Sequence, residues 1–98
     1  MIPLIDKRAT GTQLRRLMDT RGITVKDVQQ YLELGSVQSI YHWLNGSSMP
    51  TIDNLYALSE LFQVTIDEIV CGSRKPFGDS GRQILRAYYE IMQERWIA

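Results

Sequence analysis

Four polar and aromatic side chains recur at helical spacing between residues 36 and 45: Gln38, Tyr41, His42 and Asn45. Spacings of three and four place them on one side of an α-helix. Their amide, hydroxyl and imidazole groups can donate hydrogen bonds to the edges of nucleic-acid bases and accept hydrogen bonds from them. A helix face that meets only water is usually rich in Lys and Glu instead. These residue types therefore indicate a surface made for contact with a polar partner.

The other side of the same helix is apolar. Val37, Ile40, Trp43 and Leu44 recur at the complementary positions, which predicts that this side packs against a core. Ser36 stands where a helix N-cap is expected. Trp43 is therefore expected in the core, and neighbouring helices must hold the polar side outward.

Residue types needed for catalysis or metal binding are scarce. His42 is the single histidine of the chain and Cys71 the single cysteine. They cannot supply a nucleophile with its base and orienting group, a multi-ligand zinc site or an internal disulfide. The sequence therefore predicts a protein that is not an enzyme and that has no cofactor.

Length and hydropathy predict one domain. The chain has 98 residues, of which 44% are hydrophobic, and this is enough for a single core. No apolar run approaches the ~18 residues that cross a bilayer, and none has the form of a secretory signal. We therefore expect a cytoplasmic protein without membrane association.

The net charge is zero, but the charges are unevenly distributed along the chain. Residues 1–45 carry six basic and four acidic groups, whereas residues 46–70 carry four acidic groups and no basic one. Residues 71–98 carry five basic and three acidic groups. The acidic segment is thus separate from the helix with the polar face.

Apolar periodicity and capping signals predict an all-α fold. A Ser or Thr with a polar partner three positions later marks five helix starts, at Thr10, Thr24, Thr51, Thr65 and Ser80. Glycines at or just after the periodic runs mark helix ends, at Gly22, Gly35, Gly46 and Gly72. The predicted helices span residues 10–20, 24–32, 36–45, 51–61, 65–70 and 81–96.

The inner faces of these helices are predicted from their apolar residues. They are Leu14, Leu17 and Met18; Val28, Tyr31 and Leu32; Leu55, Leu58, Leu61 and Phe62; and Ile66, Ile69 and Val70. Residues 1–71 are expected to form the compact domain, residues 72–80 a linker rich in Gly, Ser and charge, and residues 81–98 an appended amphipathic helix. That last helix either folds back onto the domain or pairs with a second copy to form a homodimer.

In this order, the elements resemble the XRE-type, or lambda-repressor-like, helix-turn-helix family, a five-helix DNA-binding fold of bacterial and phage regulators. The resemblance is carried by Gly22-Ile23-Thr24, Ile40, Trp43, Asn45-Gly46, Pro50-Thr51 and the run from Leu55 to Val70. It implies that the second helix braces on the DNA backbone and that the third lies in the major groove.

The resemblance also implies which residues meet double-stranded DNA. The candidates are Thr24, Val25, Lys26, Ser36, Val37, Gln38, Ser39, Tyr41, His42, Asn45, Ser47 and Ser48. Gln38 is the sharpest candidate for base readout because its amide can pair with adenine through two hydrogen bonds. Arg15 and Arg16 are expected to be ordinary exposed charges, with a phosphate role as the alternative.

The sequence departs from the family pattern at several positions. The turn before the third helix is one residue longer than usual, Gln29 replaces the usual Ala, and the third helix and its following loop lack Lys and Arg. Met18 and Leu44 stand where many relatives have an Arg–Glu pair, so we expect these two side chains to touch. Few basic contacts imply weak, salt-sensitive or dimer-dependent binding.

Two functions are consistent with these observations. The first is a sequence-specific DNA-binding transcriptional regulator that inserts helix 36–45 in the major groove. The alternative is a protein-interaction module on the same fold, such as an antitoxin or phage accessory protein, with weak or no DNA binding. The dependence of DNA binding on salt distinguishes the two.

Overall fold

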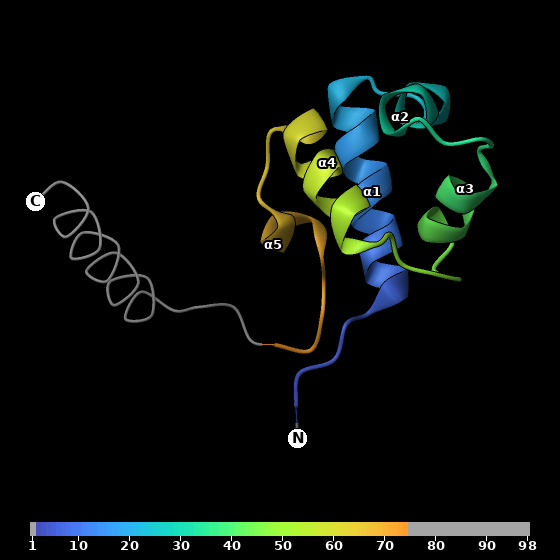
Figure 1. Ribbon diagram of the computed structural model, residues 1–98. Coiled ribbons are helices and arrows are strands. Elements are labelled where there is room, and N and C mark those ends of the chain that lie inside the picture. The colour runs from blue at the N-terminus through green and yellow to red at the C-terminus, as the bar shows by residue number, and fades with distance from the viewer. Residues whose placement is uncertain (1, 75–98) are drawn as a thin grey trace, which may run out of the picture.

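Five helices follow one another in the computed structural model, which describes residues 2–74 (Figure 1). They are α1 (Lys7–Arg21), α2 (Val25–Leu32), α3 (Gln38–Leu44), α4 (Ile52–Phe62) and α5 (Ile66–Ile69). The predicted all-α, five-helix fold is confirmed. The predicted C-terminal helix and most of the predicted linker lie outside the described residues. Within the described residues, no helix is long and apolar enough to span a membrane.

The longest helix, α1, is the centre of the arrangement. It packs against α3, α4 and α5, while α2 packs against α3 and α4. Helices α3 and α5 lie on opposite sides of α1 (Figure 1). The acidic residues of segment 46–70 belong to α4 and α5, whereas the helices that α3 packs against are α1 and α2.

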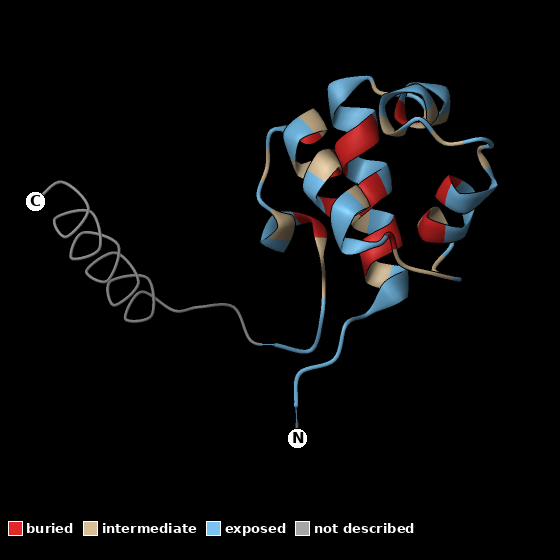
Figure 2. Ribbon diagram, viewed as in Figure 1, coloured by how far each residue is buried: buried red, intermediate tan, exposed pale blue. Residues whose placement is uncertain are grey.

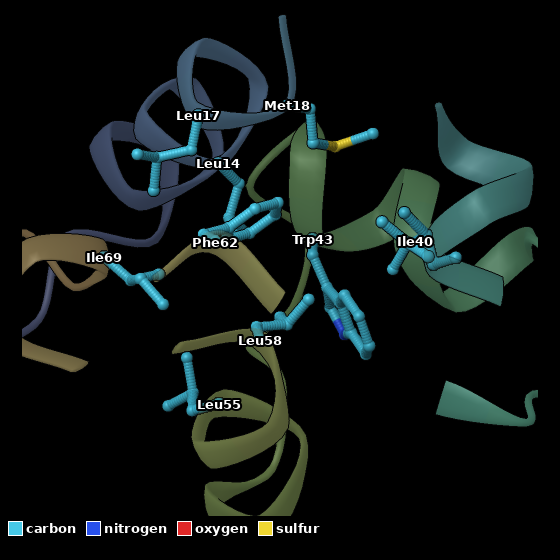
Figure 3. Close-up of a cluster of buried hydrophobic side chains, with 10 residues drawn as sticks. Leu14, Leu17, Met18, Ile40, Trp43, Leu55, Leu58, Phe62 and Ile69 are labelled. Atoms are coloured by element: carbon cyan, nitrogen blue, oxygen red, sulfur yellow. The ribbon is translucent and has the colours of Figure 1, made fainter. Parts of the chain in front are cut away.

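All four longer helices and α5 contribute side chains to one hydrophobic core (Figures 2 and 3). Its buried members are Leu14, Leu17, Met18, Val28, Ile40, Trp43, Leu55, Leu58, Phe62 and Ile69. The predicted residues Leu32, Leu61, Ile66 and Val70 pack at its edge. The inner faces predicted for α1, α4 and α5 are therefore confirmed.

Tyr31 was expected on the inner face of α2, and this is wrong because its side chain is 44% exposed. The apolar stripe of α2 consists of Val25, Val28 and Leu32, which either belong to the core or pack against it. Tyr31 lies about a quarter of a turn away from this stripe. Its ring therefore reaches solvent.

The start of α1 also differs from the prediction. Asp6, not Thr10, is the N-cap, and its Oδ1 accepts a hydrogen bond from the Ala9 N–H at 2.9 Å. Thr10 is instead buried inside the helix, where its hydroxyl donates to the Asp6 carbonyl at 2.8 Å and accepts from the Cys71 N–H at 3.0 Å. Its expected capping partner, Gln13, donates to the Glu68 carbonyl at 2.9 Å. Both polar side chains thus hold α1 to the segment around α5.

A short backbone pairing, which the sequence did not indicate, joins the two ends of the described chain. Ile5 and Gly72 form an isolated antiparallel bridge. The Ser73 N–H donates to the Leu4 carbonyl at 2.8 Å, and the Asp6 N–H donates to the Cys71 carbonyl at 2.9 Å. Two or three residues per side are too few to give a strand periodicity in the sequence.

Thr24, Thr51 and Thr65 cap α2, α4 and α5 as predicted. Thr24 and Asp27 form a complete capping box, although Asp is a weaker partner than Glu in this motif. Gly22 ends α1 in the left-handed conformation, as expected. Gly35 does not end α2, however: the C-cap of this helix is Glu33 and that of α4 is Gln63, and both residues have the left-handed conformation.

Candidate nucleic-acid interface

Two glycines allow α1 to approach the end of α3 closely. A Cβ at Gly11 would lie 2.5 Å from the Trp43 carbonyl oxygen and 2.6 Å from that of Leu44. A Cβ at Gly46, which has a φ of +81°, would lie 2.9 Å from the Cα of Arg8. Any side chain at either position would push the two segments apart, so these glycines determine how α3 sits on α1.

The inner side of α3 packs as the sequence predicts. Ile40 and Trp43 are buried, and Leu44 packs against the same cluster that contains Met18. Figure 3 draws Ile40, Trp43 and Met18 among these core side chains. Direct contact between Met18 and Leu44 stays a prediction.

The turn that leads into α3 is held from α2. The Leu34 N–H donates to the Gln29 carbonyl at 3.0 Å, and the Gln29 side-chain amide donates to the Leu34 carbonyl at 3.3 Å. Ser36 is not the N-cap of α3. That position is Val37, whose backbone is already helical, and the Ser36 hydroxyl only accepts a long bond of 3.4 Å from the Gln38 N–H.

The outer side of α3 presents a row of polar side chains to solvent. Gln38, Ser39, Tyr41, His42 and Asn45 are all exposed. The structure therefore brings together the α3 residues that the sequence singled out. Val37 differs, because it is half-buried.

The loop after α3 is folded back on the helix. The N–H groups of Ser47 and Ser48 donate to the His42 carbonyl at 2.9 and 3.3 Å. The Asn45 side-chain oxygen accepts hydrogen bonds from the Ser47 N–H and from the Ser47 hydroxyl. Two of the predicted loop residues thus have their backbone amides engaged within the protein, and the nitrogen of the Asn45 side chain remains as a donor.

The first turn of α2 forms the other predicted part of the site. Thr24 and Lys26 are exposed and Val25 is half-buried. The Thr24 N–H donates to the Asp27 carboxylate at 2.9 Å, and the Thr24 hydroxyl accepts from the Asp27 N–H at 3.1 Å. The backbone N–H of Thr24, followed by its side chain, holds the pKa of Asp27 below its ordinary value. The N–H and hydroxyl groups of Thr24 are thus both used in its capping box. The backbone N–H groups of Val25 and Lys26 are the ones that can donate to an outside partner.

A shallow hollow lies between α1 and α3. It has a volume of about 360 Å³ and is lined by Thr12, Arg15, Tyr41, Leu44 and Asn45. The hollow adjoins the polar side of α3. It adds a basic residue, Arg15, which was expected from the sequence to be an ordinary exposed charge. Gly11 and Arg15 are four residues apart, so they lie on the same side of α1. This spacing indicates that Arg15 is near α3 only once the packing of Gly11 against α3 is known.

Comparison with family models places these helices in a known group. A model described as "Helix-turn-helix" matches residues 14–69. The chain belongs to the XRE-type helix-turn-helix family. Comparison with curated proteins gave no match.

A solved structure has a similar fold. The chain matches the crystal structure of a transcriptional regulator from Listeria innocua with a TM-score of 0.63. The two sequences are 22% identical, and the match covers 90% of this chain and 87% of that one. This likeness supports the fold.

The family resemblance assigns α2 and α3 as the two helices of the motif. The second helix of such a motif characteristically meets base edges in the major groove, and the first crosses the DNA backbone. Exposed amide, hydroxyl and imidazole groups on α3 offer both donors and acceptors for such contacts.

Proposed function

We propose that the protein is a sequence-specific DNA-binding transcriptional regulator that inserts α3 in the major groove of double-stranded DNA. The exposed row Gln38, Tyr41, His42 and Asn45 on the second helix of the motif carries this proposal. The family assignment supports DNA binding, and the residue types support sequence readout. The role requires no enzymatic activity, and it places the protein in the cytoplasm, where bacterial and phage DNA is regulated.

Each part of the site has a proposed role. Gln38 reads a base through its amide, while Ser39 and His42 lie beside it on the exposed side of α3. The first-turn amides of α2, at Val25 and Lys26, face a phosphate, as free amides at helix N-termini can.

The remaining candidates flank α3. Ser36, Ser47 and Ser48 come before and after the helix and are proposed to lie along the sugar-phosphate backbone. The hydroxyl groups of Ser36 and Ser48 can donate to it, whereas that of Ser47 donates to Asn45. Val37 is half-buried and exposes part of an apolar side chain, which suits contact with a thymine methyl group.

Selection of bound sequences from a random DNA pool tests the proposal directly. The wild-type protein should enrich one sequence. Gln38→Ala should then relax base preference at one position at a cost of about 1–3 kcal/mol. Gln63→Ala, at the exposed end of α4, is the control and should retain the preference. No enrichment by the wild type, or unchanged specificity for both Gln38→Ala and His42→Ala, would contradict the proposed docking.

A homodimer formed through residues 81–98 is part of the same proposal. Two copies would read two half-sites and would raise the affinity of a domain that has few basic contacts. Analytical ultracentrifugation of the full chain and of a chain shortened after Arg74 tests this, because the shorter chain keeps the Leu4–Ser73 pairing. If each chain has the mass of its own monomer, the dimer is excluded.

The alternative function, a protein-interaction module, has its own support. Tyr31 and Tyr41 are 44% and 49% exposed, and the chain has no net positive charge. Exposed aromatic rings are common in protein interfaces. Measurable DNA binding that falls steeply with salt favours the regulator, whereas no binding even at low salt favours the interaction module.

A further inference from the structure

We propose that the hollow between α1 and α3 holds a phosphate of the DNA backbone, with Arg15 supplying the positive charge. This inference rests on the proposed DNA-binding function. It extends the contact surface to α1, which lies outside the two helices of the motif.

The lining of the hollow suits an anion. Arg15 brings a guanidinium group, Tyr41 a hydroxyl group and Asn45 a side-chain amide, and no carboxylate lines it. The remaining members are Thr12 and Leu44. Three hydrogen-bond donors around a space of about 360 Å³ can surround a phosphate oxygen and still leave room for water.

Arg15 has no competing partner within residues 2–74. It is exposed, and the salt bridge found in this part of the chain joins Arg74 to Asp67, on the other side of α1. A guanidinium group forms paired hydrogen bonds with phosphate oxygens. Arg15 can therefore bind an outside anion without breaking a contact of the fold.

The orientation of Asn45 also favours an anion. Its side-chain oxygen must be the atom that faces Ser47, because the Ser47 N–H can only donate, over 2.9 Å. The NH₂ group of the amide is left without a partner among the described residues. Because the side-chain oxygen of Asn45 is bonded to Ser47, its NH₂ group is the end of the amide that can donate to an anion in the hollow.

The position of the hollow explains how a helix without Lys or Arg could still engage the backbone. Tyr41 and Asn45 belong to both the exposed row of α3 and the lining of the hollow. When α3 lies in the major groove, the DNA backbone at the edge of that groove would therefore run close to Arg15. The basic residue missing from the loop after α3 is in effect supplied by α1.

The test measures the salt dependence of DNA binding for the full chain and two variants. Arg15→Gln removes the proposed contact. Arg16→Gln, at the next residue, is the matched control because Arg16 is also exposed and lies about 100° further round α1. Each protein is titrated against the selected duplex and against a random duplex of the same length.

Arg15→Gln should weaken binding to both duplexes by the same factor, on the order of tenfold. It should also make the plot of log K against log salt less steep by about 0.9, the change expected for one phosphate contact. Arg16→Gln should keep the wild-type slope. The same slope for Arg15→Gln and the wild type, or equal changes in both variants, would overturn the inference.

A second measurement locates the contact. Single methylphosphonates, which are uncharged, are placed in turn along the selected duplex. One position should weaken wild-type binding and leave Arg15→Gln binding unaffected. If the wild type binds the duplex but no such position exists, the inference fails while the proposed function stands. If the wild type binds neither duplex at low salt, both fail.

Discussion

Gln29 and Leu34 are hydrogen-bonded to each other in both directions. The Leu34 N–H donates to the Gln29 carbonyl, and the Gln29 side chain donates to the Leu34 carbonyl. This double connection ties the last turn of α2 to the residues that lead into α3. It gives a physical reason for Gln at position 29, because an Ala there could not donate to the Leu34 carbonyl.

Replacing Gln29 by Ala should lower the free energy of unfolding by about 1 kcal/mol, since the Leu34 carbonyl loses a partially buried partner. Urea unfolding followed by circular dichroism measures this. Gln30→Ala is the control, because Gln30 is exposed and only its backbone is bonded in the described structure. An equal loss in both variants would show that the Gln29 side-chain bond contributes nothing.

Replacing Gly11 by Ala should destabilise the domain by about 1–3 kcal/mol, because the added methyl group would overlap the carbonyl groups of Trp43 and Leu44. Thermal unfolding should show the loss as a lower Tm. Gly35→Ala is the matched control, since no heavy atom lies within 4 Å of its Cβ position. That variant should be neutral or slightly stabilising, and a Tm for Gly11→Ala at or above the wild type would contradict the close packing of α1 on α3.

Replacing Asp27 by Asn should change how stability depends on pH. The pKa of Asp27 is lowered in the folded protein, so its ionised form contributes stability above its ordinary value of 3.8, and this contribution is lost as pH falls through and below that value. The difference in stability between the wild type and Asp27→Asn should therefore shrink as pH is lowered from 7 toward 3.

Urea denaturation across this pH range measures the effect. Asp53→Asn, in the first turn of α4, controls for the loss of a carboxylate near a helix start. A constant difference between the wild type and Asp27→Asn at all pH values would argue against the role of the Thr24–Asp27 bonds.

Replacing Glu33 by Gly should stabilise the domain by about 0.5–1 kcal/mol. Glu33 has a φ of 56°, a conformation that is higher in energy for a residue with a Cβ than for glycine. Relief of this strain by glycine should exceed the destabilisation that glycine causes by raising the entropy of the unfolded chain. The midpoint of urea unfolding should rise. Glu60→Gly, inside α4, is the opposite control and should destabilise, as glycine does in a helix interior.

Local signals in the sequence predict most of the fold. The three-and-four spacing of Leu14, Leu17 and Met18 marks a buried stripe, and Thr24, Thr51 and Thr65 mark helix starts, because both features depend on residues within one or two turns. The polar side of α3 is predictable for the same reason.

Features that depend on distant residues could not be predicted in this way. Thr10 has the pattern of a helix cap, but its hydroxyl is bonded to Cys71, which is 61 positions away in the sequence. Arg15 looks like any surface charge until the packing of Gly11 on α3 brings it beside Tyr41. Ser36 also has the pattern of a helix cap, but the N-cap of α3 is Val37, whose backbone is already helical.

The pairing of Leu4 with Ser73 brings the two ends of the domain to one corner. Joining these ends by a short linker and placing new chain termini in an exposed loop, such as that around Gly35, should give a circular permutant with the same core. Any segment or domain joined to either end also starts at this corner, which borders Arg8 and Gly46 next to the end of α3. The domain therefore offers a single attachment point from which an added sequence can reach the proposed DNA-binding surface.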